Sequence, residues 1–328
     1  MNTAQRVDLF GVATDAGAGT RGVGMGPEAL RIAGMPEMLA ELDRTFVDHG
    51  DIRIPRPKAG RDAWEIAAAR KAEVLGLAAE TSAKAFESLQ TGGMPVFLGG
   101  DHSLSMGTVS GVARHGAKAG KDVHVLWVDA HTDFNTPGIS PSGNLHGMPL
   151  ALLCGEDEFD DAFGGPWRGT VDPRNVTIFG ARSIDRDERS LLTDRGIEVV
   201  DMRELDEMGV VAHVRQVIER AEGAHLHVSF DVDSMDPSIA PGTGTPVPGG
   251  LTYREGHLIM EMLHDSDLVG SLDVVEVNPY LDRSGETARL AVALISSLFG
   301  RKIMARGSVF DQPETGATSA KPRPPVRA

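Results

Sequence analysis

The sequence predicts an α/β fold built on a mainly parallel β-sheet. Short apolar segments alternate with longer segments of helical pattern, which is typical of βα units. Hydrophobic residues make up 41% of the 328 residues, enough to fill the core of one large α/β domain. Polar residues of the kinds that bind metals follow several apolar segments, and open α/β sheets bind ligands beyond the carboxyl ends of their strands.

Strands are expected where short apolar runs are bounded by turn residues. Eight such runs cover residues 6–12, 45–49, 94–98, 123–128, 175–179, 197–201, 225–230 and 270–276, and a ninth candidate covers 303–307.

Helices are expected between these strands. The segment 63–89 is rich in Ala, Glu and Lys, which have high helix propensity. Thr252 and Glu255 have the spacing of a capping box, so a helix should begin directly after Thr252. The helical patterns beyond the first cover residues 105–115, 187–195, 210–221, 253–264 and 286–299.

The chain is expected to form a single domain over residues 1–310, because no repeat or linker divides it. Residues 311–328 are rich in Pro, Ser, Thr and Ala and predict a disordered tail. The N-terminus lacks the pattern of a signal peptide, and no apolar stretch approaches the ~18 residues of a membrane-spanning helix. We therefore expect no membrane association.

The charge balance limits the classes of partner. The chain has 32 Lys and Arg against 47 Asp and Glu, a net charge of −15. This argues against nucleic acid, whose phosphates need a basic patch, and is compatible with a cationic small-molecule substrate. The one cysteine, Cys154, cannot form an intrachain disulfide, which favours a reducing, cytoplasmic location.

Two acidic clusters carry the strongest functional signal. Asp129, His131 and Asp133 follow one predicted strand, and Asp231 and Asp233 follow another. Alternate residues of an extended segment lie on one side, so each cluster should point one way. Crowded carboxylates repel one another, and a divalent metal removes that cost. Either cluster alone is a weak signal, because Asp often closes turns or caps helices.

The predicted topology brings further ligands to the same place. His102 in GGDH and Glu276 also follow predicted strands, so parallel neighbours would gather all four groups in one crevice. Two imidazoles and four carboxylates suit two metal ions, with Mn²⁺ favoured and Fe²⁺, Co²⁺ or Zn²⁺ possible. This set predicts two-metal hydrolysis. The other histidines, His225 and His227 among them, are expected to be surface or packing residues.

These residues resemble the ureohydrolase family and, within it, the arginases. The similarity runs from about residue 6 to residue 307, and the first three carboxylate and histidine blocks mark the superfamily whereas SGNLHG points to arginases. The matching segments are GGDHS (99–103), WVDAHTDFNTP (127–137), SGNLHGMP (142–149), SFDVDSMDP (229–237), GTGTPVPGGLTYREG (242–256) and SLDVVEVNP (271–279).

The resemblance implies a three-layer α/β/α sandwich of about eight strands and a binuclear manganese site. The resemblance also implies that L-arginine is hydrolysed to L-ornithine and urea when a metal-bridging hydroxide attacks the guanidinium carbon. Asp129 and Asp231 would bridge the two ions; one ion would also take His102 and Asp133, and the other His131 and Asp233.

The same resemblance implies roles in catalysis and substrate binding. Asp133 would pass a proton to the leaving amine, His146 would exchange protons with solvent, and Glu276 would pair with the guanidinium group. Residues that would hold the rest of the substrate are Asn135, Ser140, Ser142, Asn144, Asp185, Glu188 and Thr245. A bland alternative is that 140–144 is a polar loop and Asp185 a helix cap.

Some positions depart from the pattern. Ser183 stands where some arginases have Asp, Phe134 where a branched aliphatic residue is common, and Pro248 where Val is frequent. An agmatinase, a guanidinobutyrase or another guanidino-acid ureohydrolase therefore remains an alternative, and an inactive metal-binding homologue is a third. The resemblance also implies a homotrimer or homohexamer, with Arg254 and Glu255 matching inter-subunit ion pairs; otherwise they are a surface Arg and a capping Glu.

Overall fold

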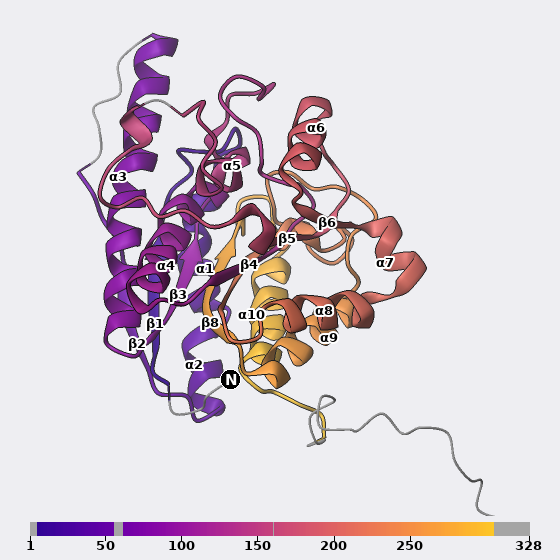
Figure 1. The fold of residues 1–328 in the computed structure, drawn as a ribbon. Helices are drawn as coiled ribbons and strands as arrows, with labels where there is room; N and C mark the ends of the chain where they lie inside the picture. The colour runs from indigo at the N-terminus through magenta and orange to yellow at the C-terminus, as the bar shows by residue number, and fades with distance from the viewer. Residues whose placement is uncertain (1–4, 56–61, 160, 305–328) are drawn as a thin grey trace, which may run out of the picture.

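The computed structural model describes residues 5–55, 62–159 and 161–304. Its centre is one sheet of eight strands in the order β2-β1-β3-β8-β7-β4-β5-β6, and every strand pair in it is parallel (Figure 1). The strands are β1 Val7–Val12, β2 Phe46–Asp51, β3 Met94–Gly99, β4 Val123–Val128, β5 Val176–Ala181, β6 Glu198–Asp201, β7 His225–Asp231 and β8 Val269–Val275.

All eight predicted strands are confirmed, each to within two residues at either end. The ninth candidate, 303–307, is not seen as a strand where it can be followed: Ile303 and Met304 lie in a bend, and 305–307 fall outside the described residues. The predicted tail, 311–328, also lies outside them.

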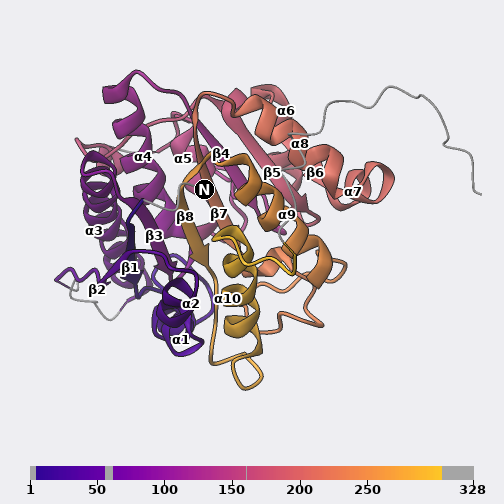
Figure 2. The same ribbon diagram turned by 90° about the horizontal axis from the view of Figure 1, so that it is seen from below.

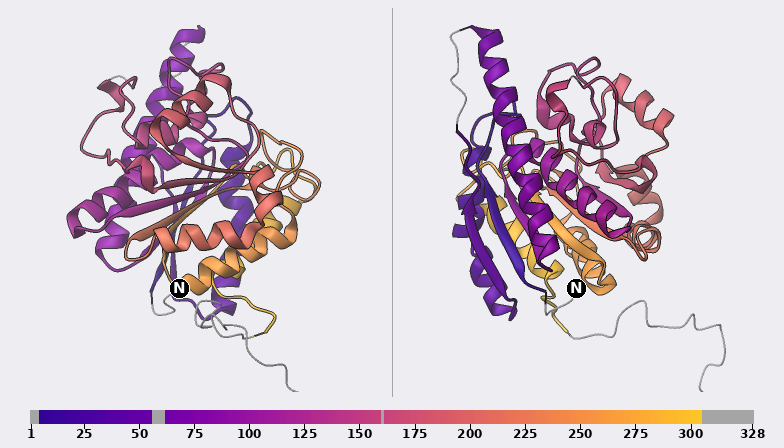
Figure 3. Two further views of the ribbon diagram at one scale, coloured as in Figure 1. Left: turned by 45° about the vertical axis from the view of Figure 1, so that its right-hand side comes forward. Right: turned by 60° about the vertical axis from the view of Figure 1, so that its left-hand side comes forward.

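Helices cover both faces of the sheet and make the three layers (Figures 2 and 3). One buried cluster joins the sheet to α1, α2, α8, α9 and α10, and the other joins it to α3, α4 and α5. The helices are α1 Gly26–Ile32, α2 Met35–Glu41, α3 Ala63–Gln90, α4 Ser105–Ala119, α5 Pro149–Leu153, α6 Arg186–Arg195, α7 Met202–Met208, α8 Val210–Arg220, α9 Tyr253–Ser266 and α10 Glu286–Leu298. No helix in the described parts of the chain is both long and apolar enough to cross a membrane.

The long helices were predicted, whereas four short ones were missed. The missed helices, α1, α2, α5 and α7, have only five to seven residues, too few to show a helical period. The capping box at the start of α9 is confirmed, with the Glu255 amide donating to Thr252 Oγ1 at 3.3 Å and the Thr252 amide donating to Glu255 Oε2 at 2.8 Å.

The two histidines of β7 provide a test of stability against pH. His225 Nε2 lies 2.8 Å from Ser271 Oγ, and burial, with the nearby His227 and Lys121, lowers the pKa of His225 to about 3. Because this pKa lies below that of an unfolded histidine, the unfolded chain takes up the proton first. The contribution to stability is therefore complete above pH ~6.5 and is lost as pH falls toward 3.

We expect His225→Asn to flatten this dependence. Between pH 6.5 and 4 the free energy of unfolding of the wild type should fall faster than that of the variant, by roughly 1 kcal/mol per pH unit. Urea unfolding at a series of pH values measures both slopes. Parallel slopes would contradict the assignment.

Candidate active site

Polar side chains gather at the carboxyl ends of the four central strands, β3, β8, β7 and β4. His102 follows β3, Asp129 follows β4, Asp231 ends β7 and Glu276 follows β8. Since the strands are parallel, their carboxyl ends lie along one edge of the sheet. The four predicted groups therefore meet.

His102 faces three carboxylates. Its Nδ1 lies 3.1 Å from Asp129 Oδ2, 3.1 Å from Asp133 Oδ2 and 3.2 Å from Asp231 Oδ2. This nitrogen is buried, yet it has no hydrogen-bond partner of good geometry among the described residues. A buried lone pair surrounded by carboxylate oxygens fits a divalent metal ligand.

His131 forms a second group that shares Asp129 with the first. Its Nδ1 lies 3.5 Å from Asp129 Oδ1 and 3.1 Å from Asp233 Oδ2. The two carboxylate oxygens of Asp129 thus face different imidazoles. Two sets that could hold an ion, His102–Asp129–Asp133 and Asp129–His131–Asp233, each have ligand atoms within 4.8 Å of one another. The residues fit a pair of metal ions with a shared carboxylate.

The electrostatics show the cost of this crowding. Burial and the charge of Asp129 raise the pKa of Asp133 to about 7. Burial lowers the pKa of His131, but the carboxylates of Asp233 and Asp129 outweigh it and raise that pKa to about 12. Buried carboxylates that share protons with imidazoles are the ones that a divalent cation would neutralise.

Glu276 links His102 to His146. Its Oε1 accepts a hydrogen bond from the His102 amide at 2.9 Å and lies 2.9 Å from His146 Nδ1. Burial lowers the pKa of His146, but the charge and hydrogen bond of Glu276 raise it to about 9. Glu276 and Asp133 both have positive φ angles, 63° and 46°, although neither is glycine.

Three supporting residues were not recognised in the sequence. The Trp127 ring stacks on His102 with centroids 4.0 Å apart, and its Nε1 donates to Asp129 Oδ2 at 3.0 Å. Ser229 Oγ lies 2.8 Å from His102 Nε2. Arg182 Nη2 donates to the Asp233 carbonyl at 2.7 Å. The signal for two of them is spacing: Trp127 and Ser229 stand two residues before Asp129 and Asp231 and so lie on the same side of their strands.

A cavity of about 160 Å³ opens onto these groups. It takes in most of the predicted ligand and substrate residues, together with Gly147 and Ser183. Its lining consists of His102, His131, Asp133, Asn135, Ser142, His146, Gly147, Ser183, Asp185, Glu188, Asp231, Asp233 and Thr245. Thr245 Oγ1 donates to Asp233 Oδ2 at 3.0 Å, which ties this wall to the second group.

One wall of the cavity is formed by the carboxylate of Asp185 and the side-chain amide of Asn135. Asn135 Nδ2 donates to Asp185 Oδ2 at 3.1 Å, so the two side chains are held together. Glu188 is buried and serves the backbone: its Oε1 accepts the Phe134 amide at 2.8 Å and its Oε2 accepts the Asp185 amide at 3.1 Å. Asp185 does cap α6, as the bland alternative holds, and it also faces the cavity.

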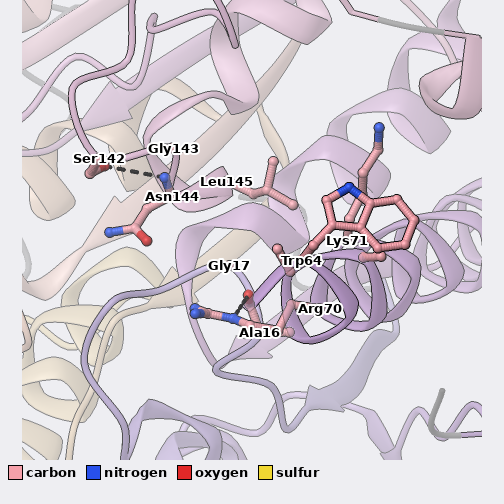
Figure 4. Close-up of a pocket in the computed structure, with 11 residues that line it drawn as sticks. Ala16, Gly17, Trp64, Arg70, Lys71, Ser142, Gly143, Asn144 and Leu145 are labelled. Carbon is pink, nitrogen blue, oxygen red and sulfur yellow. Dashed lines mark hydrogen bonds between the residues drawn. The ribbon is translucent and has the colours of Figure 1, made fainter. Parts of the chain in front are cut away.

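Ser140 and Asn144 are placed differently from Ser142. Ser140 Oγ accepts a hydrogen bond from the Gly143 backbone amide at 3.0 Å, and Ser142 Oγ accepts one from the Asn144 backbone amide at 3.2 Å. Only Ser142 lines the cavity described above. Ser140 and Asn144 therefore shape the loop. A second pocket of about 560 Å³ lies against this loop, with Asn144 and Leu145 on one side and Trp64 of α3 on the other (Figure 4). Ser142 lines both hollows, so the loop is the wall between them.

Comparison with known proteins assigns the family. Residues 5–300 match the family model described as "Arginase family". A protein named arginase from Agrobacterium fabrum is 46% identical over 307 residues, 93% of this chain and 94% of that protein. An arginase from Bacillus caldovelox is 43% identical over 91% of this chain and 99% of its own length.

Solved structures agree. The crystal structure of arginase from Bacillus cereus matches with a TM-score of 0.83 at 40% identity, covering 92% of this chain and 100% of that one. The shared fold and the matched length leave one assignment: the chain belongs to the arginase family and is a ureohydrolase enzyme.

Proposed function

We propose that the protein is a manganese-dependent arginase that hydrolyses L-arginine to L-ornithine and urea. The observation that carries this is the position of Asp129, whose two oxygens face the imidazoles of His102 and His131, and both imidazoles line a cavity that Asp185 also lines. The arginase names of the relatives at 46% and 43% identity support the same activity.

Two Mn²⁺ ions are the proposed cofactor, with Fe²⁺, Co²⁺ or Zn²⁺ as possible substitutes. The residues that would hold one ion are His102, Asp129, Asp133 and Asp231, and those that would hold the other are His131, Asp129, Asp231 and Asp233. When bound, such a pair supplies hydroxide from water near neutral pH.

The chain's own groups would handle the protons. Asp133 is a buried carboxyl group that lines the cavity, with Oδ2 3.1 Å from His102 Nδ1, so it is placed to take up a proton and pass it on. It would protonate the leaving amine, which cannot depart as an anion. His146, partly exposed and held by Glu276, would exchange that proton with solvent. Glu276 would also attract the guanidinium group.

The α-amino and α-carboxylate groups of the substrate would bind at the wall formed by Asp185, Asn135 and Ser142. Asp185 would pair with the α-amino group, and Asn135 and Ser142 would donate to the α-carboxylate. Ser140 and Asn144 would act by fixing the loop that carries Ser142. Glu188 would hold Asp185 in place through the hydrogen bond from its amide, and Thr245 would line the pocket beside Asp233.

The test is urea release from three substrates by the Mn²⁺-loaded protein. L-Arginine should exceed agmatine and guanidinobutyrate in kcat/KM by about 10- to 100-fold, because each lacks a charged group worth roughly 1.5–3 kcal/mol of hydrogen bonding. Ser142→Ala should lower kcat/KM for L-arginine and leave kcat/KM for agmatine unchanged. A preference for agmatine or guanidinobutyrate would favour those ureohydrolase activities, and no turnover of any guanidino compound would favour a metal-binding homologue without activity.

We also propose that residues 1–310 act as one domain, that the protein lies in the cytoplasm without a membrane or nucleic-acid partner, and that it assembles as a homotrimer or homohexamer. Arg254 is exposed beside the exposed Tyr253, as an inter-subunit contact would require, while Glu255 caps α9. Sedimentation of a species near the chain mass of 34.8 kDa would reject the oligomer.

A further inference from the structure

We propose that Asp273 is a positioning residue for the metal site, and that it fixes through Ser105 and Ser229 which ring nitrogen His102 presents to the metal. This inference rests on the proposed function, because it takes His102 as a metal ligand. Asp273 itself lies on β8, two residues before the end of that strand, and does not line the substrate cavity.

The sheet places these residues on one buried face. Ser229 of β7 and Asp273 of β8 are register partners, so their side chains lie side by side. Helix α4 covers this face, and Ser105 and Thr108, three residues apart, point the same way from it. All four of these side chains are at most 1% exposed. The group is thus a polar layer enclosed between sheet and helix.

A continuous chain of contacts leads from Asp273 to His102. Ser105 Oγ donates to Asp273 Oδ2 at 2.7 Å. Ser105 Oγ lies 3.4 Å from Ser229 Oγ, which lies 2.8 Å from His102 Nε2. Each hydroxyl has only one hydrogen to donate.

The carboxylate sets the direction of that chain. Oδ2 of Asp273 can only accept, and it receives the hydroxyls of both Ser105 and Thr108, the latter at 2.6 Å. Ser105 has then used its hydrogen and must accept from Ser229. Ser229 in turn must accept from His102, so Nε2 of His102 carries a hydrogen and Nδ1 keeps its lone pair. Nδ1 is the nitrogen that faces Asp129, Asp133 and Asp231.

The opposite direction would defeat metal binding. If Ser229 donated to Nε2, a neutral His102 would carry its hydrogen on Nδ1, directed at the metal position.

The surroundings of Asp273 offer one other route for its charge. A buried carboxylate is costly, and Asp273 keeps its Oδ1 without a partner among the described residues. His227 can carry a positive charge, and its Nε2 lies 3.3 Å from Asp273 Oδ2. Its other ring nitrogen, Nδ1, lies 2.9 Å from Ser271 Oγ, away from His102. Only the Ser105 arm reaches the metal ligands.

The experiment compares two hydroxyls that contact the same oxygen. Ser105→Ala breaks the chain, whereas Thr108→Val removes a donor to Asp273 Oδ2 and leaves the chain intact. Asp273→Asn allows the amide to donate to Ser105 and reverse the direction. Two readouts are the Kd for Mn²⁺ from chelator competition and the Nε2–H signal of His102 by ¹⁵N NMR in the Zn²⁺-loaded protein, which is diamagnetic.

Asp273→Asn and Ser105→Ala should each raise the Kd about 10- to 100-fold, as loss of a partner to a ligating histidine does, and should weaken the Nε2–H signal. Thr108→Val should change the Kd less than about threefold. If Asp273→Asn does not fold, Ser105→Ala still decides the matter. Equal Kd values and an unchanged signal in Ser105→Ala and Thr108→Val would overturn the inference while arginase activity stood. A wild type that binds no metal would overturn the proposed function instead.

Discussion

Asp129→Ala is expected to bind neither metal ion and to lose at least about 10³-fold in kcat/KM for L-arginine. Asp129 is the residue common to both ligand groups, with one oxygen toward His102 and the other toward His131. The two imidazoles outweigh burial and hold the pKa of Asp129 well below its usual range, so it stands ready as an anion. Metal content by mass spectrometry, measured beside the kinetics, gives the result.

Asp233→Ala is the matched control. Asp233 belongs to the His131 group alone, so this variant should keep one ion per chain where Asp129→Ala keeps none. Thermal unfolding of both variants in chelator checks that the fold survives. Two ions in Asp129→Ala, or equal losses in the two variants, would contradict the shared role.

Asp133→Asn should lower kcat by about 10²- to 10⁴-fold, the usual range for losing a general acid–base group. The asparagine amide has nearly the same shape but cannot take up and return a proton. The wild-type carboxyl group lines the cavity, which places it for that exchange. Steady-state kinetics at saturating L-arginine measures kcat.

Adding Mn²⁺ to the assay distinguishes a loss of proton transfer from a loss of metal binding in this variant. Assays at saturating Mn²⁺ should leave the defect in place if proton transfer is lost. Restoration of near wild-type kcat by added metal would assign Asp133 a ligand role only.

Much of the sheet was predictable because strands such as β3, with the sequence MPVFLG, are buried on both faces and form continuous apolar runs. The substrate side was less so: the sequence does not distinguish Ser142, which lines the cavity, from Ser140 and Asn144, which shape its loop. That difference depends on how a five-residue loop closes on itself. The helices α1 and α2 were missed for a similar reason, since tertiary packing rather than a repeated pattern stabilises seven residues.

The prediction that His225 and His227 are surface or packing residues left out their polar partner, Ser271. His227 is buried and His225 is partly buried, and both lie within hydrogen-bond distance of Ser271 Oγ. The sequence HLHVSFD carries the signal, because polar residues alternate with apolar ones along β7. In a sheet covered by helices on both faces, such alternation indicates a buried polar layer on one of them.

The positive φ angles of Asp133 and Glu276 have a consequence for engineering this enzyme. Glycine fits such backbone best, and a larger residue there costs on the order of 1 kcal/mol or more. A search guided by stability alone would be drawn to glycine at these two positions, where it would remove the proposed proton carrier, Asp133, and the partner of His146. Thermal resistance in this fold is better sought at other positions, since the proposed reaction and the backbone make opposite demands on the same two residues.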